Sequence, residues 1–317
     1  MSTHSQTPSF RSYLDEHLDR RRALGVLGVG AVATVTAACS EPSPDQAAGT
    51  ARPAKNSPTA SPSPPASPSP SASADNGQAG GDLTSSRDEI IEKYQDASPG
   101  MFGLAVSGVK LSLPDGSGAA ALTLDACGGS NGSAADRELL NTLRDLGVPA
   151  TLFINQRWAK ANHTMMEEIV SEPLFEVENH GTHHLPLSVN GASAYGVQGT
   201  SSAAGVYDEI MENQEFLRTE YGVTCRYFRS GTAHLDETSA QICNDLGLTP
   251  VNFTINLDDG ATLPAQTVAS HAATLSTTDI LLGHFNQPAS GTGTGLAQAL
   301  PQLLAEDTRF ITLEEAH

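Results

Sequence analysis

From about Thr84 onward, short apolar runs alternate with longer amphipathic stretches, and this alternation restricts the fold more than any other feature of the chain. The apolar runs have the length and pattern of β-strands. They cover residues 119–125, 150–154, 174–178, 224–228, 250–255, 279–283 and 310–313. The stretches between them predict helices at 138–146, 164–171, 204–221, 237–246 and 296–306. Such alternation is typical of parallel strands joined by helical crossovers, so the sequence predicts an α/β fold, layered or barrel-shaped.

The first eighty residues have a different composition and predict an export signal followed by a disordered tether. Residues 1–39 contain adjacent arginines at 20–22, a weakly apolar run, and small residues before Cys39. These features resemble a twin-arginine signal that ends in a lipobox, so we expect export and membrane attachment through a lipid on Cys39. Thr36 stands where a lipobox usually has a larger aliphatic residue, and an uncleaved anchor helix is the alternative. Residues 40–82 are rich in Pro, Ser and Ala and cannot bury enough apolar surface to fold.

The net charge of the chain argues against a nucleic-acid binder, and the cysteines of the folded part, predicted to span 83–317, argue against a disulfide-rich protein. The chain has 36 acidic and 17 basic residues, a formal net charge of -19. A general nucleic-acid binder is excluded, because phosphate contacts need clustered Lys and Arg. Cys225 lies on a predicted strand and Cys243 on the helix that follows. Because such layers pack about 10 Å apart, we expect buried thiols rather than a disulfide framework.

Polar side chains follow the carboxyl ends of five predicted strands. They are Asp125, His180, Arg229, the pair Asp258 and Asp259, and His284. In a β/α barrel these strand ends meet on one face, where active sites are built. Any one of these residues alone could be a helix cap or a turn residue, but the five positions together predict a functional site.

The segment from Asn179 to His184 contains three histidines, of which His180 and His184 are spaced i, i+4. On a helical turn, this spacing would place both imidazoles on one face, where they could share a divalent metal. Two imidazoles favour zinc, cobalt, nickel or iron over calcium or magnesium. The alternative is a loop in which the histidines are merely polar surface residues.

Three further residues have the chemistry of acid-base catalysis. Asp125 ends the run Thr123-Leu124-Asp125 and could act as a general base toward a water, with Arg229 as its bidentate partner. In the alternative, Asp125 caps a helix and Arg229 pairs with any nearby acid. His284 follows the apolar run 280–283 and could protonate a leaving amine, although a single histidine after a strand is more often structural.

Five motifs, taken in their order along the chain, resemble those of the NodB-type polysaccharide deacetylases, carbohydrate esterase family 4. They are Thr123-Leu124-Asp125, residues 147–154, Asn179-His180 with His184, residues 228–231, and Leu281-Leu282-Gly283-His284. The resemblance covers roughly residues 118–317. It implies a distorted (β/α) barrel and the metal-dependent removal of acetyl groups from N-acetylated sugars, with zinc as the expected metal and cobalt or nickel as alternatives.

The resemblance also implies a role for individual residues. Asp125 would be the catalytic base, Arg229 would orient it, and His284 would be the catalytic acid. Asp259 lies in the segment that usually holds an Asp and a Trp, and it would tune His284. The Trp of that segment is absent here.

One departure from the family pattern concerns the metal. The resemblance makes His180 and His184 metal ligands, but family members usually carry a second aspartate ligand where this chain has Ala126. Cys127, His183 or a water could take the place of the missing carboxylate. A thiolate would be a strong zinc ligand.

The sequence therefore predicts an exported, lipid-anchored, metal-dependent hydrolase that removes N-acetyl groups from cell-surface or wall polysaccharide, with an acetylated glycan as substrate. Three alternatives remain at this point. They are a degenerate barrel that binds glycan without hydrolysing it, a solute- or metal-binding lipoprotein, and an esterase that acts on O-acetyl sugars.

Overall fold

The structure, a computed structural model, describes residues 85–316 of the chain. The predicted export signal at 1–39, the predicted tether at 40–82 and the predicted lipid site at Cys39 lie outside the described residues. The described part falls within one unit, Ala74–His317. Within it, no helix is both long and apolar enough to cross a membrane.

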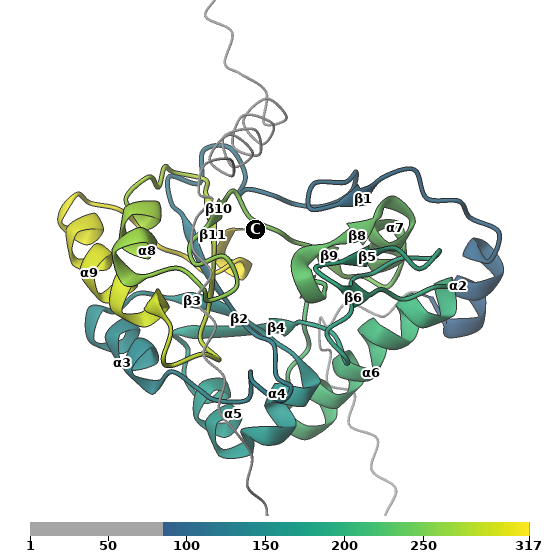
Figure 1. Ribbon diagram of the computed structural model, residues 1–317, viewed down its shortest axis with the longest axis horizontal. Helices are drawn as coiled ribbons and strands as arrows, with labels where there is room; N and C mark the ends of the chain where they lie inside the picture. Colours follow the sequence, from purple (N-terminus) through teal and green to yellow (C-terminus); the bar gives the residue numbers. More distant parts are fainter. Residues whose placement is uncertain (1–84, 317) are drawn as a thin grey trace, which may run out of the picture. The chain divides into compact units, whose positions relative to one another are not determined.

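A seven-stranded parallel sheet forms the centre of the described part, with the strand order β10-β11-β2-β3-β4-β7-β9 (Figure 1). The strands are β2 Ala121–Ala126, β3 Ala150–Ile154, β4 Phe175–Asn179, β7 Tyr227–Phe228, β9 Thr249–Pro250, β10 Ile255–Asn256 and β11 Ile280–His284. The two edge strands, β9 and β10, are consecutive in the sequence and only residues 251–254 separate them. The sheet therefore curls back on itself, and the predicted distorted (β/α) barrel is confirmed.

The two faces of the sheet have different neighbours because side chains alternate along each strand. On β2, Leu122, Leu124 and Ala126 belong to the large hydrophobic cluster that also contains the buried helix residues. Ala121 instead packs in a second cluster with Phe153, on the inner face of the barrel. Each strand therefore sends one set of side chains toward the helices and the other toward the interior, which leads to the site.

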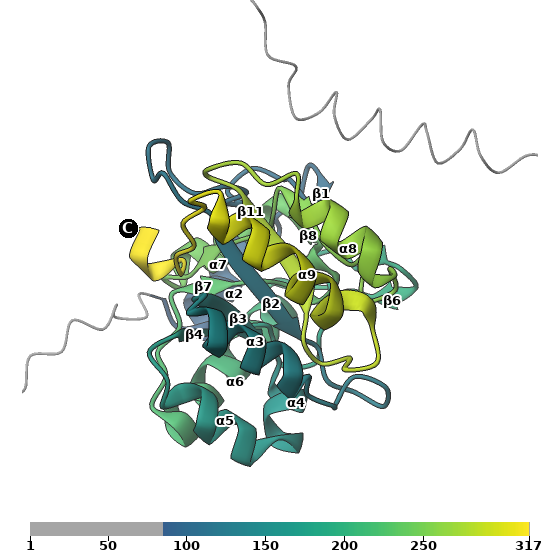
Figure 2. The ribbon, with the colours of Figure 1, turned by 90° about the vertical axis from the view of Figure 1, so that its left-hand side faces the viewer.

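Eight helices of residues 85–316 surround this sheet. Their order around it runs from α9 and α8 through α3, α5, α4 and α6 to α7 and α2 (Figures 1 and 2). Among residues 85–316 they are α2 Arg87–Tyr94, α3 Arg137–Leu146, α4 Gln156–Ala161, α5 His163–Val170, α6 Ala203–Tyr221, α7 Glu237–Asp245, α8 Ala265–Ala272 and α9 Gly291–Ala305. Helix α3 begins after Asp136, whose side chain accepts the backbone N–H of Leu139, and ends at Gly147 in the left-handed conformation. The α8 helix packs on α9, and α9 on α3.

Two small antiparallel sheets complete the described part. Strand β1, Phe102–Gly103, pairs with β8, Leu235–Asp236. Strands β5, Ser193–Ala194, and β6, Val197–Gln198, form a hairpin. Short 3₁₀ turns lie at Gly231–Ala233 and Glu314–Ala316.

Three of the predicted strands differ from the structure, and the one predicted at 224–228 is reduced to Tyr227–Phe228. The run 250–255 was expected to be one strand, but its two ends pair with different neighbours: the N–H of Val251 donates to the carbonyl of Phe228, while that of Thr254 donates to the carbonyl of Ile280. The strand predicted at 310–313 is also wrong, because Phe310 makes only an isolated bridge to Ala120. The three helices that were not predicted, α2, α4 and α8, are all short.

The cysteine prediction is confirmed. Cys225 and Cys243 are buried and unbridged. Burial raises the pKa of both thiols, which keeps them protonated and inert. These two residues therefore act as small apolar side chains of the core.

Candidate active site

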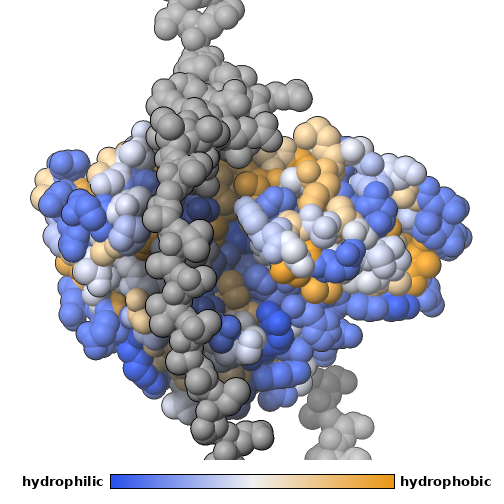
Figure 3. All heavy atoms as spheres, viewed as in Figure 1, coloured by the Kyte–Doolittle hydropathy of each residue, from blue (hydrophilic) through white to orange (hydrophobic). Residues whose placement is uncertain are grey.

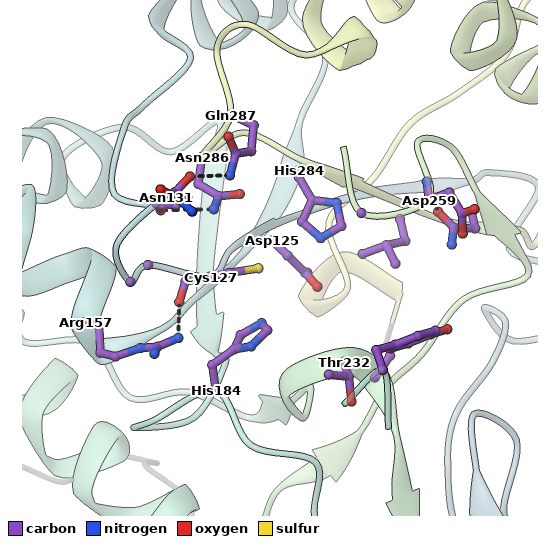
Figure 4. A pocket seen from close by; sticks show the side chains of 18 of the residues that line it. Asp125, Cys127, Asn131, Arg157, His184, Thr232, Asp259, His284, Asn286 and Gln287 are labelled. Carbon is purple, nitrogen blue, oxygen red and sulfur yellow. Dashed lines mark hydrogen bonds between the residues drawn. The ribbon is translucent and has the colours of Figure 1, made fainter. Parts of the chain in front are cut away.

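A cavity of about 690 Å³ lies at the carboxyl ends of the parallel strands. The side chains of Asp125, Cys127, His184 and His284 point toward one another in it (Figure 4). Seen from outside, the surface is hollowed in the middle of the molecule, with hydrophilic residues in its depth and hydrophobic residues along its upper edge (Figure 3). The polar residues predicted at separate strand ends are thus gathered around one space.

Asp125 and Arg229 form a buried ion pair beneath this cavity. Nη1 of Arg229 donates to Oδ1 of Asp125 at 2.7 Å, and the Arg229 side chain is fully buried. Its Nε and Nη2 donate to the backbone carbonyls of Val251 and Asn252 at 3.2 and 3.3 Å. The guanidinium also lies 4.1 Å from the centroid of the Phe153 ring. The two residues that were expected to pair do so, but through one hydrogen bond and not as the bidentate pair expected, because the other guanidinium N–H groups bind backbone carbonyls.

Cys127, His180 and His184 form a second group, whose potential ligand atoms all lie within 4.8 Å of one another. Nε2 of His180 is 3.8 Å from Sγ of Cys127 and 3.6 Å from Oδ2 of Asp125. The rings of His180 and His184 meet edge to face, with centroids 4.8 Å apart. The structure therefore brings the two predicted metal ligands together and adds one of the three alternatives that the sequence left open.

Cys127 shares the cavity with Asp125 because the two residues are two positions apart on an extended chain. Ala126, between them, is fully buried in the cluster that faces the helices. The chain turns directly after Cys127, at Gly128, which has a φ of 70°. A Cβ on this residue would lie 2.6 Å from the backbone nitrogen of Trp158, so only glycine fits the turn.

The electrostatic surroundings of Cys127 differ from those of the two core thiols. Burial opposes ionisation, but the charge of His184 and hydrogen bonds with His180, His184 and His284 together hold the pKa of Cys127 well below its ordinary value. The thiolate is the form that binds metals and acts as a nucleophile. Cys127 is thus the reactive thiol among those of the described part.

His180 is fixed by its backbone neighbours. Its Nδ1 lies 2.8 Å from the carbonyl oxygen of Arg229. A carbonyl can only accept, so Nδ1 carries a hydrogen, and in the neutral ring the lone pair is on Nε2, on the side of Cys127. Nδ2 of Asn155 donates to the carbonyls of His180 and Gly181 at 3.0 and 2.7 Å, which holds the start of the histidine loop.

His184 reaches the group through an irregular loop and not through the helical turn considered from the sequence. Gly181 and His184 have φ values of 78° and 63°, in the left-handed region. Glu209 of α6, which is 2% exposed, accepts the backbone N–H groups of His183 at 3.0 Å and Leu185 at 3.1 Å. The i, i+4 pair therefore converges because a buried carboxylate holds the backbone on both sides of His184.

His284 ends β11 beside Asp125, its partner in the strand register. Its Nδ1 is 2.9 Å from Oδ1 of Asp258, and its backbone N–H donates to Oδ2 at 2.8 Å. The Thr292 hydroxyl donates to the same Oδ2 at 2.7 Å. Burial lowers the pKa of His284, but hydrogen bonds with Asp258 and Cys127 outweigh it and raise this pKa well above its ordinary value.

The carboxylate that pairs with His284 is thus Asp258, and the prediction of Asp259 for this role is corrected. Asp258 is fully buried, two residues after the end of β10. Asp259 is exposed at the cavity wall, with a φ of 51°. Adjacent residues of a chain in this conformation direct their side chains differently, and the sequence alone did not settle which of the two faces β11.

Several residues that shape the cavity were not predicted from the sequence. Tyr195 stands on the β5–β6 hairpin, is 79% exposed, and stacks edge to face on His234 with ring centroids 5.2 Å apart. Thr232 has a φ of 65° and lies in a strained turn that lines the cavity. Gly231 passes so close to the histidine loop that a Cβ would overlap the backbone of His184. For Thr232 and Gly231, the available signal was their position directly after the Phe228-Arg229-Ser230-Gly231 motif.

Comparison with known proteins gives the same fold. The sequence model of the polysaccharide deacetylase family matches residues 113–251. A family 4 carbohydrate esterase pseudoenzyme from Bacillus anthracis has a TM-score of 0.56 at 18% identity, covering 67% of this chain and 69% of its own. A peptidoglycan N-acetylglucosamine deacetylase, Bc1960, has a TM-score of 0.56 at 20% identity, covering 73% and 96%. A family 4 acetyl xylan esterase from Clostridium thermocellum, solved with a cobalt ion, has a TM-score of 0.51 at 21% identity, covering 62% and 89%.

At these identities the solved structures establish the fold of the chain and not its activity. Together, the family match and the shared fold support a polysaccharide deacetylase domain in the described part. One of the three structures is a pseudoenzyme, so the activity has to be argued from the residues of the cavity.

Proposed function

We propose that this protein is a metal-dependent hydrolase that removes N-acetyl groups from a cell-surface or wall polysaccharide. One observation carries the proposal: a single cavity holds a carboxylate paired with a buried arginine, a histidine paired with a buried aspartate, and a Cys/His/His group between them. These are the parts required for hydrolysis of an amide by water, namely a base, an acid and an electrophilic centre.

The Cys/His/His group fits a divalent metal such as zinc, with cobalt or nickel as alternatives. Catalytic zinc sites use three protein ligands of the Cys, His and carboxylate types and keep one position open. Cys127 and His184 line the cavity, and His180 is buried beside them with its Nε2 3.8 Å from Sγ of Cys127. When bound, such a metal supplies Lewis-acid polarisation of an acetyl carbonyl.

In this proposal, Asp125 accepts the proton of the attacking water. A general base must lie within hydrogen-bond reach of the water, and Asp125 lines the cavity with one oxygen, Oδ2, on the side of His180. Its other oxygen is held by Arg229 at 2.7 Å. Arg229 is therefore a positioning residue, which keeps the carboxylate oriented while the proton moves.

His284 donates a proton to the leaving nitrogen. Because Asp258 holds Nδ1, the other ring nitrogen, Nε2, is the one on the side of Cys127 and the cavity. The raised pKa of His284 favours its protonated form near neutral pH, as an acid requires. An amine is a poor leaving group unless it is protonated, so a well-supported acid favours N-acetyl over O-acetyl substrates.

The shape of the cavity is compatible with a sugar as the group that carries the acetyl. Its volume of about 690 Å³ lies in the range of small-molecule sites. Tyr195 lines it and is largely exposed, so its ring is available to a ligand. Aromatic rings of this kind provide a flat apolar surface with a polar edge.

Export and lipid anchoring are part of the same proposal and rest on the sequence. The adjacent arginines at 20–22, the small residues before Cys39 and the Pro/Ser/Ala-rich residues 40–82 would place the domain outside the cytoplasmic membrane. Replacement of Cys39 by Ala should release the protein from the membrane fraction. Equal membrane retention of both forms would contradict lipid attachment at this residue.

The experiment that tests the activity measures acetate release from N-acetylglucosamine oligomers by the metal-loaded protein. His180→Ala and His284→Ala should both abolish acetate release, with circular dichroism spectra like that of the wild type. Wild-type rates in both variants would contradict the proposal. An O-acetylated xylan assayed in parallel separates an amidase from an esterase.

A second candidate function is glycan binding without hydrolysis. Ala126, at the position where related sequences usually have a metal-binding carboxylate, favours this candidate. It predicts stoichiometric binding of N-acetylglucosamine oligomers with no acetate released under zinc, cobalt or nickel. Turnover under any of these metals would contradict it.

A further inference from the structure

We propose that Sγ of Cys127 is the third protein ligand of the metal, and that it takes over the role that the missing carboxylate at position 126 would have had. The inference deepens the proposed function and rests on it only for the presence of a metal in this cavity. Its consequence is a thiolate-containing metal centre in a fold where oxygen would be expected at that place.

The direction of the strand explains why position 127, and not 126, supplies the ligand. Asp125 and Cys127 both line the cavity, whereas Ala126 is fully buried in the cluster shared with the helices. In this backbone, a carboxylate at position 126 would be directed into an apolar core, where an unpaired charge is costly. Ala126 is therefore suited to its apolar surroundings, and the metal donor is Cys127, one residue further along the chain.

The distances suit a small metal centre. Sγ of Cys127 is 3.8 Å from Nε2 of His180, and all three donors lie within 4.8 Å of one another. In a tetrahedral site with bonds of about 2.0–2.3 Å, donor atoms are separated by roughly 3.3–3.8 Å. Small rotations of the side chains are enough to bring the three donors to these separations.

The donors are also arranged by their outer neighbours. The carbonyl of Arg229 accepts from Nδ1 of His180, so the neutral ring has its lone pair on Nε2, 3.8 Å from the Cys127 sulfur. Glu209 holds the backbone on either side of His184. Gly128 allows the turn that directs Cys127 into the cavity. Each of the three donors thus has its own support.

The charge of the group is the same as that of a carboxylate with two imidazoles, because a thiolate also carries a single negative charge. The thiolate sulfur is a softer donor than a carboxylate oxygen. Sulfur and imidazole donors select zinc and cobalt over magnesium, calcium and manganese, which prefer oxygen. We therefore expect the site to bind zinc or cobalt, and we expect an excess of magnesium not to compete for it.

The experiment is a cobalt titration of the purified full chain after removal of bound metal with a chelator. A thiolate bound to Co²⁺ gives an intense sulfur-to-cobalt charge-transfer band in the near ultraviolet, which oxygen and nitrogen donors do not give. The wild type should show this band. Cys127→Ser should lose it and bind cobalt more weakly, by more than the ~10–100-fold that loss of an outer hydrogen-bond partner costs.

Two further variants make the result specific. Cys225→Ser replaces a cysteine that is buried in the core, and it should keep the band. Cys127→Asp supplies a carboxylate at the same place, and it should bind cobalt without the band. If Cys127→Ser does not fold, the wild type, Cys225→Ser and Cys127→Asp still decide the question.

The inference is overturned if the wild type binds cobalt without the band, if it binds no cobalt, or if Cys127→Ser keeps the band and the affinity. Acetate release is measured on the same samples. A band without acetate would refute the proposed activity and leave the thiolate ligand standing. Acetate release without the band would support the proposed activity and refute the thiolate ligand.

Discussion

Nη1 of Arg229 lies 2.7 Å from Oδ1 of Asp125, and both side chains are withdrawn from solvent. Arg229 follows β7 and Asp125 lies on β2, so the pair joins two strands that are separated in the sheet by β3 and β4. A buried charge is tolerated only when it is paired and hydrogen-bonded. The ion pair therefore connects the stability of the barrel with the orientation of the proposed base.

Arg229→Met should lower the free energy of unfolding by about 3–5 kcal/mol, because it leaves the Asp125 carboxylate buried without its partner. Acetate release should fall as well. Urea denaturation measures the stability change. Arg226→Met is the matched control: its salt bridge to Glu314 is half exposed and should contribute less than about 1 kcal/mol. Equal stability of the two variants would contradict this account of the pair.

Asp258→Asn should reduce kcat for acetate release by about 10²-fold or more, since the imidazole loses the charge that supports its protonated form. The pH profile should change with it, because the raised pKa of His284 depends in part on the Asp258 hydrogen bond. Asp259→Asn, one residue further on and exposed, is the control and should stay near the wild-type rate. Larger losses in Asp259→Asn than in Asp258→Asn would restore the assignment made from the sequence.

Glu209→Ala should weaken metal binding by about 10–100-fold, because Glu209 holds the backbone N–H groups beside His184 without touching the metal donors itself. Calorimetric titration with zinc measures the effect. Glu212→Ala, one helical turn away and exposed, should bind zinc like the wild type. Zinc affinity that is the same in both variants would show that the histidine loop does not need this carboxylate.

Glu176 and Glu178, two residues apart on β4, should make the protein less stable as the pH rises. Burial is the main cause that raises the pKa of each carboxyl group. The negative charge of Glu176 raises the pKa of Glu178 further. With a folded pKa above the ordinary value, the folded state binds more protons than the unfolded state in the window above about pH 4.5. The stability present below that window is therefore lost as the pH rises through the folded pKa.

Glu176→Gln should reduce this loss, because it removes one titrating group and its repulsion of Glu178. Urea denaturation at about pH 5 and about pH 8 measures the difference. Between these two pH values the variant should lose less free energy of unfolding than the wild type. An equal or larger loss in the variant would mean that the pair is not responsible.

The sequence predicted the fold and the convergence of its polar strand ends because both depend on strands of clear apolar character. Asp125, Arg229 and His284 follow such strands, and their meeting at one end of the barrel results from the parallel topology. The strand at 250–255 was less predictable, since a run of apolar residues does not reveal that its two ends pair with different edges of the sheet.

Several contacts of the site depend on the directions in which side chains point, which a sequence does not give. Asp258 and Asp259 are chemically identical neighbours, and only the backbone geometry after β10 decides which one faces His284. Glu209 lies in the middle of a long helix, and nothing in its spacing indicates that it contacts the histidine loop. For Cys127, the available signal was its position two residues after Asp125, because side chains alternate between the two faces of a strand. The structure shows that Asp125 and Cys127 line the cavity, whereas Ala126 packs toward the helices.

The central claim is that one cavity combines a metal with the acid and base of a deacetylase. The most direct test is elemental analysis of the purified protein after loosely bound ions have been removed, paired with acetate release from N-acetylglucosamine oligomers. We predict one tightly held divalent metal per chain and release of acetate. A protein that holds no metal and releases no acetate, even with added zinc, cobalt or nickel, would contradict the claim.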